Sequence, residues 1–122
     1  MIEVELPYPP SVNHYWRRVG PRTLISRGGR AFREAVCSIL AARGVRPLLG
    51  WLDVRIDLFP PDRRRRDLDN SLKSLLDAMQ HAGMYEDDNQ IARLTAQRRE
   101  PRPGGLAVVR VCPLDAPEGA TT

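Results

Sequence analysis

Cysteine and long apolar segments are both scarce in this chain of 122 residues. The two cysteines, Cys37 and Cys112, stand alone in apolar sequence, so neither a disulfide framework nor a cysteine-rich metal site is expected. We expect both to be buried free thiols. No apolar run approaches the roughly 20 residues that span a bilayer, and the N-terminus lacks the basic start and apolar core of a signal peptide. These absences exclude a disulfide scaffold and favour a cytoplasmic protein.

Lysine is almost missing, because 18 of the 19 basic residues are arginine and Lys73 is the only lysine. The net charge of +4 and the pI near 9.7 favour an anionic partner. Arginine binds phosphate bidentately and stacks on bases, so an arginine-rich surface suits nucleic acid. A GC-rich genome would produce the same excess. The excess alone therefore does not identify a partner.

No internal repeat, low-complexity tract or linker interrupts the chain, and its length predicts one domain. Alternating and helical hydrophobic patterns predict four strands and two helices. The strands are expected at residues 2–6, 51–59, 91–98 and 106–111, the helices at about 30–44 and 70–81, and a loop at 11–16, with a minor strand at 23–26 as an optional addition. This β-α-β-α-β-β order predicts a compact α+β domain over residues 1–115, with two helices packed on a mixed sheet. Residues 116–122 are expected to form a frayed tail.

The segment between the second strand and the second helix reads DRRRRDLDN, from Asp62 to Asn70. Arginines bind phosphate, and paired carboxylates bind hard divalent cations such as Mg²⁺. Asp67 and Asp69 are two residues apart and point the same way if the segment is extended. Such a pair can hold an ion that activates water and stabilises the leaving oxygen in phosphoryl transfer. The segment thus predicts a place where a phosphodiester is bound and cut.

Simpler interpretations of the same residues remain open at this point. Asp69 is well placed to be the N-cap of the second helix, and Asp67 could form a surface ion pair with an arginine. Lys73 could pair with Asp69 at i, i+4, or it could neutralise charge on a phosphate in the transition state. Arg63–Arg66 could be a solvated run of charge. Likewise, Tyr15 and Trp16, which precede Arg17 and Arg18, could stack on exposed bases or complete the core.

A third acidic ligand is harder to place, although seven of the fifteen acids lie between residues 62 and 88. Asp88 is the candidate. The intervening helix is about 18 Å long at 1.5 Å per residue. Residues 83–88 reach back roughly 20 Å when fully extended. Closure within one chain is possible but tight, and a partner subunit could supply this acid instead.

Several short segments form a longer pattern together. They are Pro9-Pro10-Ser11-x-Asn13, Pro61 to Asn70, Lys73, Asp77-Ala78 and Ala82-Gly83-x-x-x-Asp87-Asp88-x-Gln90. The pattern runs from about Leu6 to the last strand and resembles the RusA family of Holliday junction resolvases. One departure is Glu86, which stands where an apolar residue is expected and leaves open which neighbouring acid binds metal.

The resemblance implies a homodimeric crossover junction endodeoxyribonuclease of a kind common in phages. Such an enzyme depends on Mg²⁺, needs no organic cofactor or membrane, and nicks two strands of like polarity in a four-way DNA junction during recombination or repair. The family's catalytic acids correspond to Asp67, Asp69 and Asp88, which would bind the metal, and its essential lysine corresponds to Lys73. We expect the DNA-binding residues to be Asn13, Arg17, Arg18, Arg63, Arg64, Arg65 and Arg66.

Two other functions remain as alternatives. One is a metal-dependent nuclease for flaps, forks or other branched DNA. The other is a non-catalytic, arginine-rich DNA-binding module in which the acids serve only as caps and ion pairs. Magnesium-dependent nicking of a junction separates the last function from the two nucleases.

Overall fold

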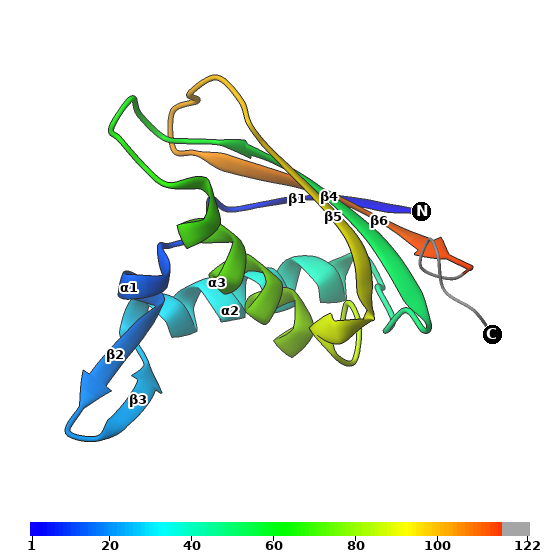
Figure 1. Ribbon diagram of the computed structural model, residues 1–122, viewed down its shortest axis with the longest axis horizontal. Coiled ribbons are helices and arrows are strands. Elements are labelled where there is room, and N and C mark those ends of the chain that lie inside the picture. The colour runs from blue at the N-terminus through cyan, green and yellow to red at the C-terminus, as the bar shows by residue number, and fades with distance from the viewer. Residues whose placement is uncertain (116–122) are drawn as a thin grey trace.

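A mixed four-stranded sheet forms the centre of the computed structural model, which describes residues 1–115 (Figure 1). The strands are β1 (Ile2–Leu6), β4 (Trp51–Phe59), β5 (Ile91–Arg98) and β6 (Leu106–Leu114), in the spatial order β1-β6-β4-β5. β4 pairs antiparallel with β6 and parallel with β5, and β5 forms one edge of the sheet. Because β4 and β5 are parallel, the loops that follow them leave from the same end of the sheet.

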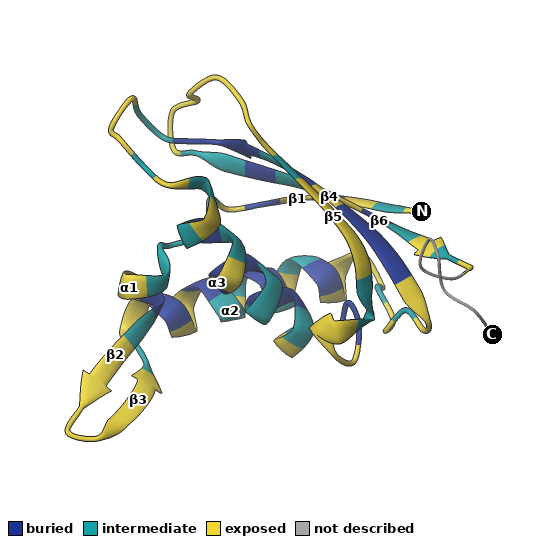
Figure 2. Cartoon of the chain, viewed as in Figure 1, coloured by how far each residue is buried: buried dark blue, intermediate teal, exposed yellow. Residues whose placement is uncertain are grey.

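Two helices, α2 (Arg27–Ala42) and α3 (Leu68–His81), cover one face of this sheet (Figure 1). Alternate residues of β4 point to the helices, because successive side chains in a strand face opposite sides. These residues are buried, as are the helix residues that meet them (Figure 2): Leu52, Val54, Ile56, Leu58, Val36, Leu40, Leu75 and Met79. The opposite face carries exposed charged residues, including Arg55 and Arg110, and no helix of the described chain covers it.

A short helix and a hairpin precede α2. Helix α1 (Val12–Tyr15) leads into β2 (Trp16–Val19) and β3 (Arg22–Ile25), which pair antiparallel and project from the body (Figure 1). The hydroxyl of Ser26 accepts a 2.9 Å hydrogen bond from the amide of Gly29 and caps α2. A Cβ at Gly29 would lie 2.3 Å from the carbonyl oxygen of Tyr15. Only glycine therefore allows α2 to begin so close to α1.

The predicted α+β class and the β-α-β-α-β-β order of the major elements are confirmed. Besides the last strand, which runs to Leu114 instead of residue 111, three details differ. Residues 12–16 of the expected loop form α1 and the start of β2, and α2 begins at Arg27 because Ser26 caps it. α3 begins at Leu68, before the expected Asn70, because Leu68 packs against the core.

The remaining predictions about the chain fare differently. Cys37 and Cys112 are free, as expected, but half-buried instead of buried. None of the helices within residues 1–115 is long and apolar enough to cross a membrane. The predicted tail, 116–122, lies outside the described residues.

Candidate active site

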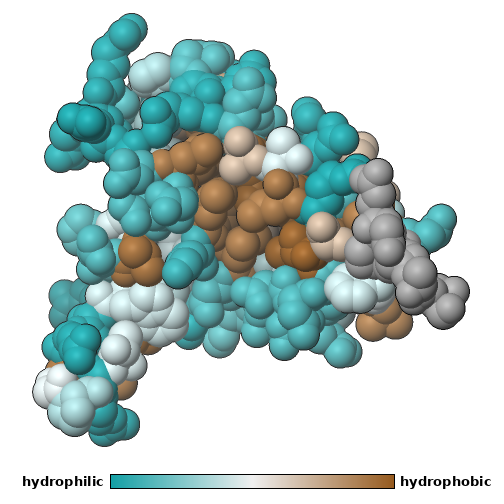
Figure 3. Space-filling model, viewed as in Figure 1, coloured by the Kyte–Doolittle hydropathy of each residue, from teal (hydrophilic) through white to brown (hydrophobic). Residues whose placement is uncertain are grey.

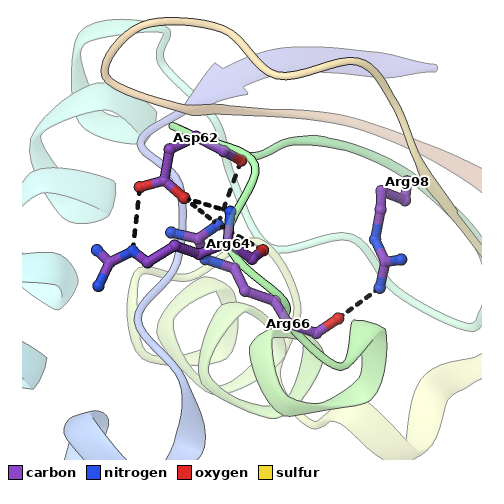
Figure 4. Close-up of polar contacts among 4 residues, drawn as sticks. All are labelled: Asp62, Arg64, Arg66 and Arg98. Atoms are coloured by element: carbon purple, nitrogen blue, oxygen red, sulfur yellow. Dashed lines mark hydrogen bonds and ion pairs between the residues drawn. The ribbon is translucent and has the colours of Figure 1, made fainter.

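The segment between β4 and α3, residues 60–67, is called the motif loop here, and Asp62 organises it. One carboxylate oxygen, Oδ1, accepts hydrogen bonds from the amide of Arg64 at 2.9 Å and from Nη1 of Arg66 at 2.7 Å (Figure 4). The hydrogen bond from Arg66 is the main reason why the pKa of Asp62 lies well below its usual value. The guanidinium of Arg66 also lies 5.8 Å from the ring centre of Tyr8. Asp62 and Arg66 therefore fix the shape of the loop.

The four arginines of the motif loop are not equivalent. Arg66 is half-buried and bound to Asp62, whereas the side chain of Arg64 is 82% exposed and lies 3.4 Å from the same carboxylate. Arg63 and Arg65 are exposed, and neither forms an ion pair within residues 1–115. The guanidinium groups open to a ligand are therefore those of Arg63, Arg64 and Arg65.

Asp67 and Asp69 flank the first residue of α3, and both are exposed. Asp67 occupies the N-cap position, but its side chain makes no capping hydrogen bond, and Asp69 lies in the first turn. The prediction that Asp69 is the N-cap is wrong, because α3 already begins at Leu68 and Asp67 therefore takes the N-cap position. Only Asp67 has the extended backbone that was expected for the pair. Within residues 1–115 neither carboxylate forms a hydrogen bond or an ion pair between side chains, so both are open to a cation.

Lys73 lies one turn after Asp69 on α3 and is exposed. No ion pair joins it to Asp69 or Asp77 within the described residues, so the simple i, i+4 interpretation is not supported. The carboxylate of Asp77 accepts hydrogen bonds from the hydroxyl of Tyr15 and from Nη2 of Arg33, the latter at 2.7 Å. Burial raises the pKa of Tyr15, and its hydrogen bond to Asp77 raises it further. Asp77 is thus committed to the packing of α1, α2 and α3, and the ammonium of Lys73 stays in solvent.

A cleft of about 950 Å³ opens beside these groups. Its walls come from the N-terminal loop, the motif loop, and the starts of α2 and α3, and they include Tyr8, Pro10, Arg64, Arg65, Asp67 and Asn70. An anionic chain lying in the cleft would therefore meet the arginines of the motif loop next to Asp67.

The acids at the other end of α3 belong to a loop that Gln90 holds in place. Its side-chain oxygen accepts hydrogen bonds from the amides of Glu86 and Asp87, and its side-chain nitrogen donates to the carbonyl of Leu48 at 2.9 Å. Asp87 and Gln90 form a capping box around the short 3₁₀ helix η1 (Asp88–Gln90). Sequence reasoning did not foresee this role of Gln90, although Asp-x-x-Gln is the signature of a capping box. The carboxylate of Asp88, in contrast, has no hydrogen bond or ion pair within residues 1–115.

The structure does not bring the three expected metal ligands together in one chain. Asp67 and Asp69 lie at the start of α3, and Asp88 follows its end. Among the described residues, no three acidic, histidine or cysteine side chains are grouped so that they could hold a metal ion. One subunit therefore offers a pair of acids at one end of α3 and a single acid beyond the other.

The remaining expected DNA-binding residues lie on α1 and the hairpin. Asn13, Arg17 and Arg18 are exposed. Tyr15 is completely buried and Trp16 half-buried, so the two aromatic residues complete the core instead of standing free to stack on bases.

The description of the family model that matches this chain is "Endodeoxyribonuclease RusA", and the match covers residues 7–110. The chain belongs to the RusA family. Among its curated relatives, the crossover junction endodeoxyribonuclease of Enterobacteria phage HK97 is 40% identical over 112 residues, which cover 91% of this chain and 93% of the relative. The enzymes of that name from Enterobacteria phage 82 and Escherichia coli K12 are 43% and 42% identical, each covering 72% of this chain and 74% of the relative. This RusA-family protein is therefore an endonuclease, and its matched region contains the motif loop, α3 and the loop that Gln90 organises.

Proposed function

We propose that this protein is a magnesium-dependent endonuclease that resolves four-way DNA junctions by paired symmetric nicks. It would act as a homodimer in the cytoplasm during recombination or repair. The observation that carries the proposal is the pair of unengaged carboxylates, Asp67 and Asp69, beside the arginines of the motif loop. The RusA-family relatives that are named crossover junction endodeoxyribonucleases support the choice of substrate.

The donor set of this site fits Mg²⁺. The ion prefers oxygen ligands and is usually held by one or two carboxylates, with water and substrate phosphate completing the octahedron. Asp67 and Asp69 supply such carboxylates, and the cleft beside Asp67 leaves room for the phosphate. When bound, Mg²⁺ would supply a Lewis acid for the attack of water on the phosphodiester.

The other residues of the site bind and position the DNA strand. Arg63, Arg64 and Arg65 would hold phosphates along the cleft through bidentate hydrogen bonds. Lys73 would stabilise the negative charge that develops on the scissile phosphate, since its ammonium has no carboxylate partner among the described residues. Exposed Asn13, Arg17 and Arg18 would contact the backbone beyond the cleft.

We infer that Asp88 completes the site in trans. Helix α3 exposes part of an apolar stripe, Leu68, Leu72 and Leu76, and Leu94 on the edge strand β5 is 41% exposed. Hydrophobic atoms gather over α3 and β5 in Figure 3. A two-fold dimer formed through this surface buries the same patch twice, and it covers the unpaired edge of β5.

An antiparallel arrangement of the two α3 helices would bring opposite ends together. The 14 residues of α3 span about 21 Å, so the start of one helix would lie beside the end of the other. Asp67 and Asp69 of one subunit would then meet Asp88 of its partner. The same arrangement gives two identical sites, which match the symmetry of a four-way junction.

Asp87 and Asp88 are expected to respond differently to neutralisation. Asp88→Asn removes a carboxylate with no other task in residues 1–115, so cleavage should fall by orders of magnitude while the melting temperature is unchanged. Asp87→Asn keeps a capping side chain, because Asn caps about as well as Asp, so cleavage should fall no more than a few fold. Initial cleavage rates and thermal unfolding of both variants check this. A larger loss for Asp87→Asn would assign the metal ligand to Asp87.

Cleavage of synthetic DNA tests the proposed function. With Mg²⁺ the protein should convert a four-way junction to two nicked duplexes by cuts at symmetry-related positions, and it should not cut with EDTA. Equal cleavage of forks or flaps would favour the broader branched-DNA nuclease. Junction binding without cleavage in any divalent cation would favour the non-catalytic module.

A further inference from the structure

A second group of arginines, Arg98, Arg99 and Arg102, lies against the motif loop although about 35 residues separate the two segments in sequence. The parallel pairing of β4 and β5 is the cause, since both strands end at the same end of the sheet. Arg98 donates a 2.6 Å hydrogen bond to the carbonyl of Arg66 (Figure 4). The amide of Arg102 donates to the carbonyl of Pro60 at 2.8 Å. The two loops therefore lie side by side, with the side chain of Arg98 on the helix-covered face of the sheet and that of Arg99 on the open face.

Stacking on Phe59 holds two of these guanidinium groups in place. Arg102 lies 4.2 Å and Arg99 lies 5.8 Å from the centre of the Phe59 ring, which is only 7% exposed. A guanidinium stacked on a ring keeps its N–H edge open to an anion. Arg99 also lies 3.6 Å from Asp57 and 3.9 Å from Glu100, whereas Arg102 forms no ion pair within the described residues. Arg102 is thus fixed in position with its charge uncompensated.

The loop that carries these residues is anchored at its far end by Gly105. The amide of Gly105 donates to the carbonyl of Arg102 at 2.9 Å, and its φ of +73° favours glycine. A Cβ there would lie 2.7 Å from the Cβ of Tyr8. The loop is therefore packed tightly against the N-terminal segment. Arginine side chains that are already fixed in position before binding lose little conformational entropy when they bind a ligand.

We propose that Arg99 and Arg102 form a second phosphate-binding surface that holds the backbone of a double-helical DNA arm. This proposal rests on the proposed function and adds a site beyond the motif loop. Duplex backbone suits the surface better than unpaired bases, because Phe59 is covered and no exposed ring at Arg98–Arg102 offers a stacking platform. Phosphate contacts of this kind carry affinity and orientation without reading sequence.

The test is a salt titration of junction binding, measured by fluorescence anisotropy in EDTA. Arg99→Met with Arg102→Met removes two charges but keeps unbranched apolar side chains over Phe59. The matched control is Arg43→Gln with Arg46→Gln, which removes two charges from exposed residues that precede β4 and form no ion pair within residues 1–115. Each phosphate contact contributes about 0.9 to the slope of log affinity against log salt. The Met variant should therefore lose close to 2 in slope and roughly tenfold in affinity, and the control much less.

The outcomes separate this inference from the proposed function. Equal losses in the Met variant and the control would show an effect of net charge only and would overturn the second surface. The second surface would also be overturned if both the Met variant and a parallel Arg99→Gln/Arg102→Gln variant fail to fold. That result would mean that the two arginines serve to cover Phe59. Failure of the proposed function would instead appear in the unmodified protein, as equal affinity for junction and duplex.

Discussion

Asp69→Asn is expected to abolish cleavage of a four-way junction while the protein still folds and binds the junction. The carboxylate of Asp69 has no side-chain partner among residues 1–115, so its loss breaks no contact. The substitution still removes a negative charge that interacts favourably with the helix dipole in the first turn of α3, so the free energy of unfolding should fall by about 0.3–1 kcal/mol. A neutral amide is a poor ligand for Mg²⁺, so the rate should fall by orders of magnitude. Junction affinity should stay the same or rise, because a negative charge near phosphate is removed.

Three measurements on the same preparation check this result: thermal unfolding, anisotropy binding in EDTA, and single-turnover cleavage in Mg²⁺. Asp115→Asn is the matched control, since Asp115 is an exposed acid that follows β6, at the opposite end of the sheet from the motif loop. The control should cut at the unmodified rate. A variant at Asp69 that also cuts at that rate would remove Asp69 from the site, and an equal loss in both variants would point to net charge.

Much of the fold could be predicted because local hydrophobic patterns in the sequence indicate its strands and helices. β4 carries a buried aliphatic side chain at every second position from Leu52 to Leu58, and α3 repeats its apolar residues at helical spacing. α1 and the start of β2 were missed because Pro9 and Pro10 favour an extended chain, and the close approach of Gly29 to Tyr15 is a tertiary contact. No local pattern records such a contact.

The sequence offers candidate residues for the site but not their arrangement. The motif loop could be found because its arginines and acids are adjacent in sequence. Arg98–Arg102 could not, because their place beside that loop depends on the parallel register of β4 with β5. Asp62 likewise gains its organising role only when the loop folds back and Arg66 reaches it. Interactions between segments that are far apart in the chain could therefore not be predicted from the sequence.

The length of α3 leads to a decisive experiment on the third acid. Asp69→Asn and Asp88→Asn should each be inactive alone, yet an equal mixture that exchanges subunits should regain activity if Asp88 acts in trans. In a mixed dimer one site then lacks both acids and the other has every ligand. With half of the dimers mixed, about one quarter of the unmodified number of sites is restored. If Asp88 acts in cis, each site in the mixed dimer still lacks one acid and no activity returns.

The products report the arrangement independently of the rate. A mixed dimer with one working site should nick only one strand of a cruciform plasmid and yield open circles, whereas the unmodified dimer cuts both strands and yields linear DNA. Mixing Asp67→Asn with Asp69→Asn is the control, because both acids belong to the same subunit and every site remains defective in either arrangement. Activity in that control would mean that Asp67 and Asp69 serve different sites. If the mixture of Asp69→Asn and Asp88→Asn stays inactive although subunit exchange is verified, Asp88 acts in the site of its own subunit. The loop after α3 would then have to move about 20 Å to reach Asp69.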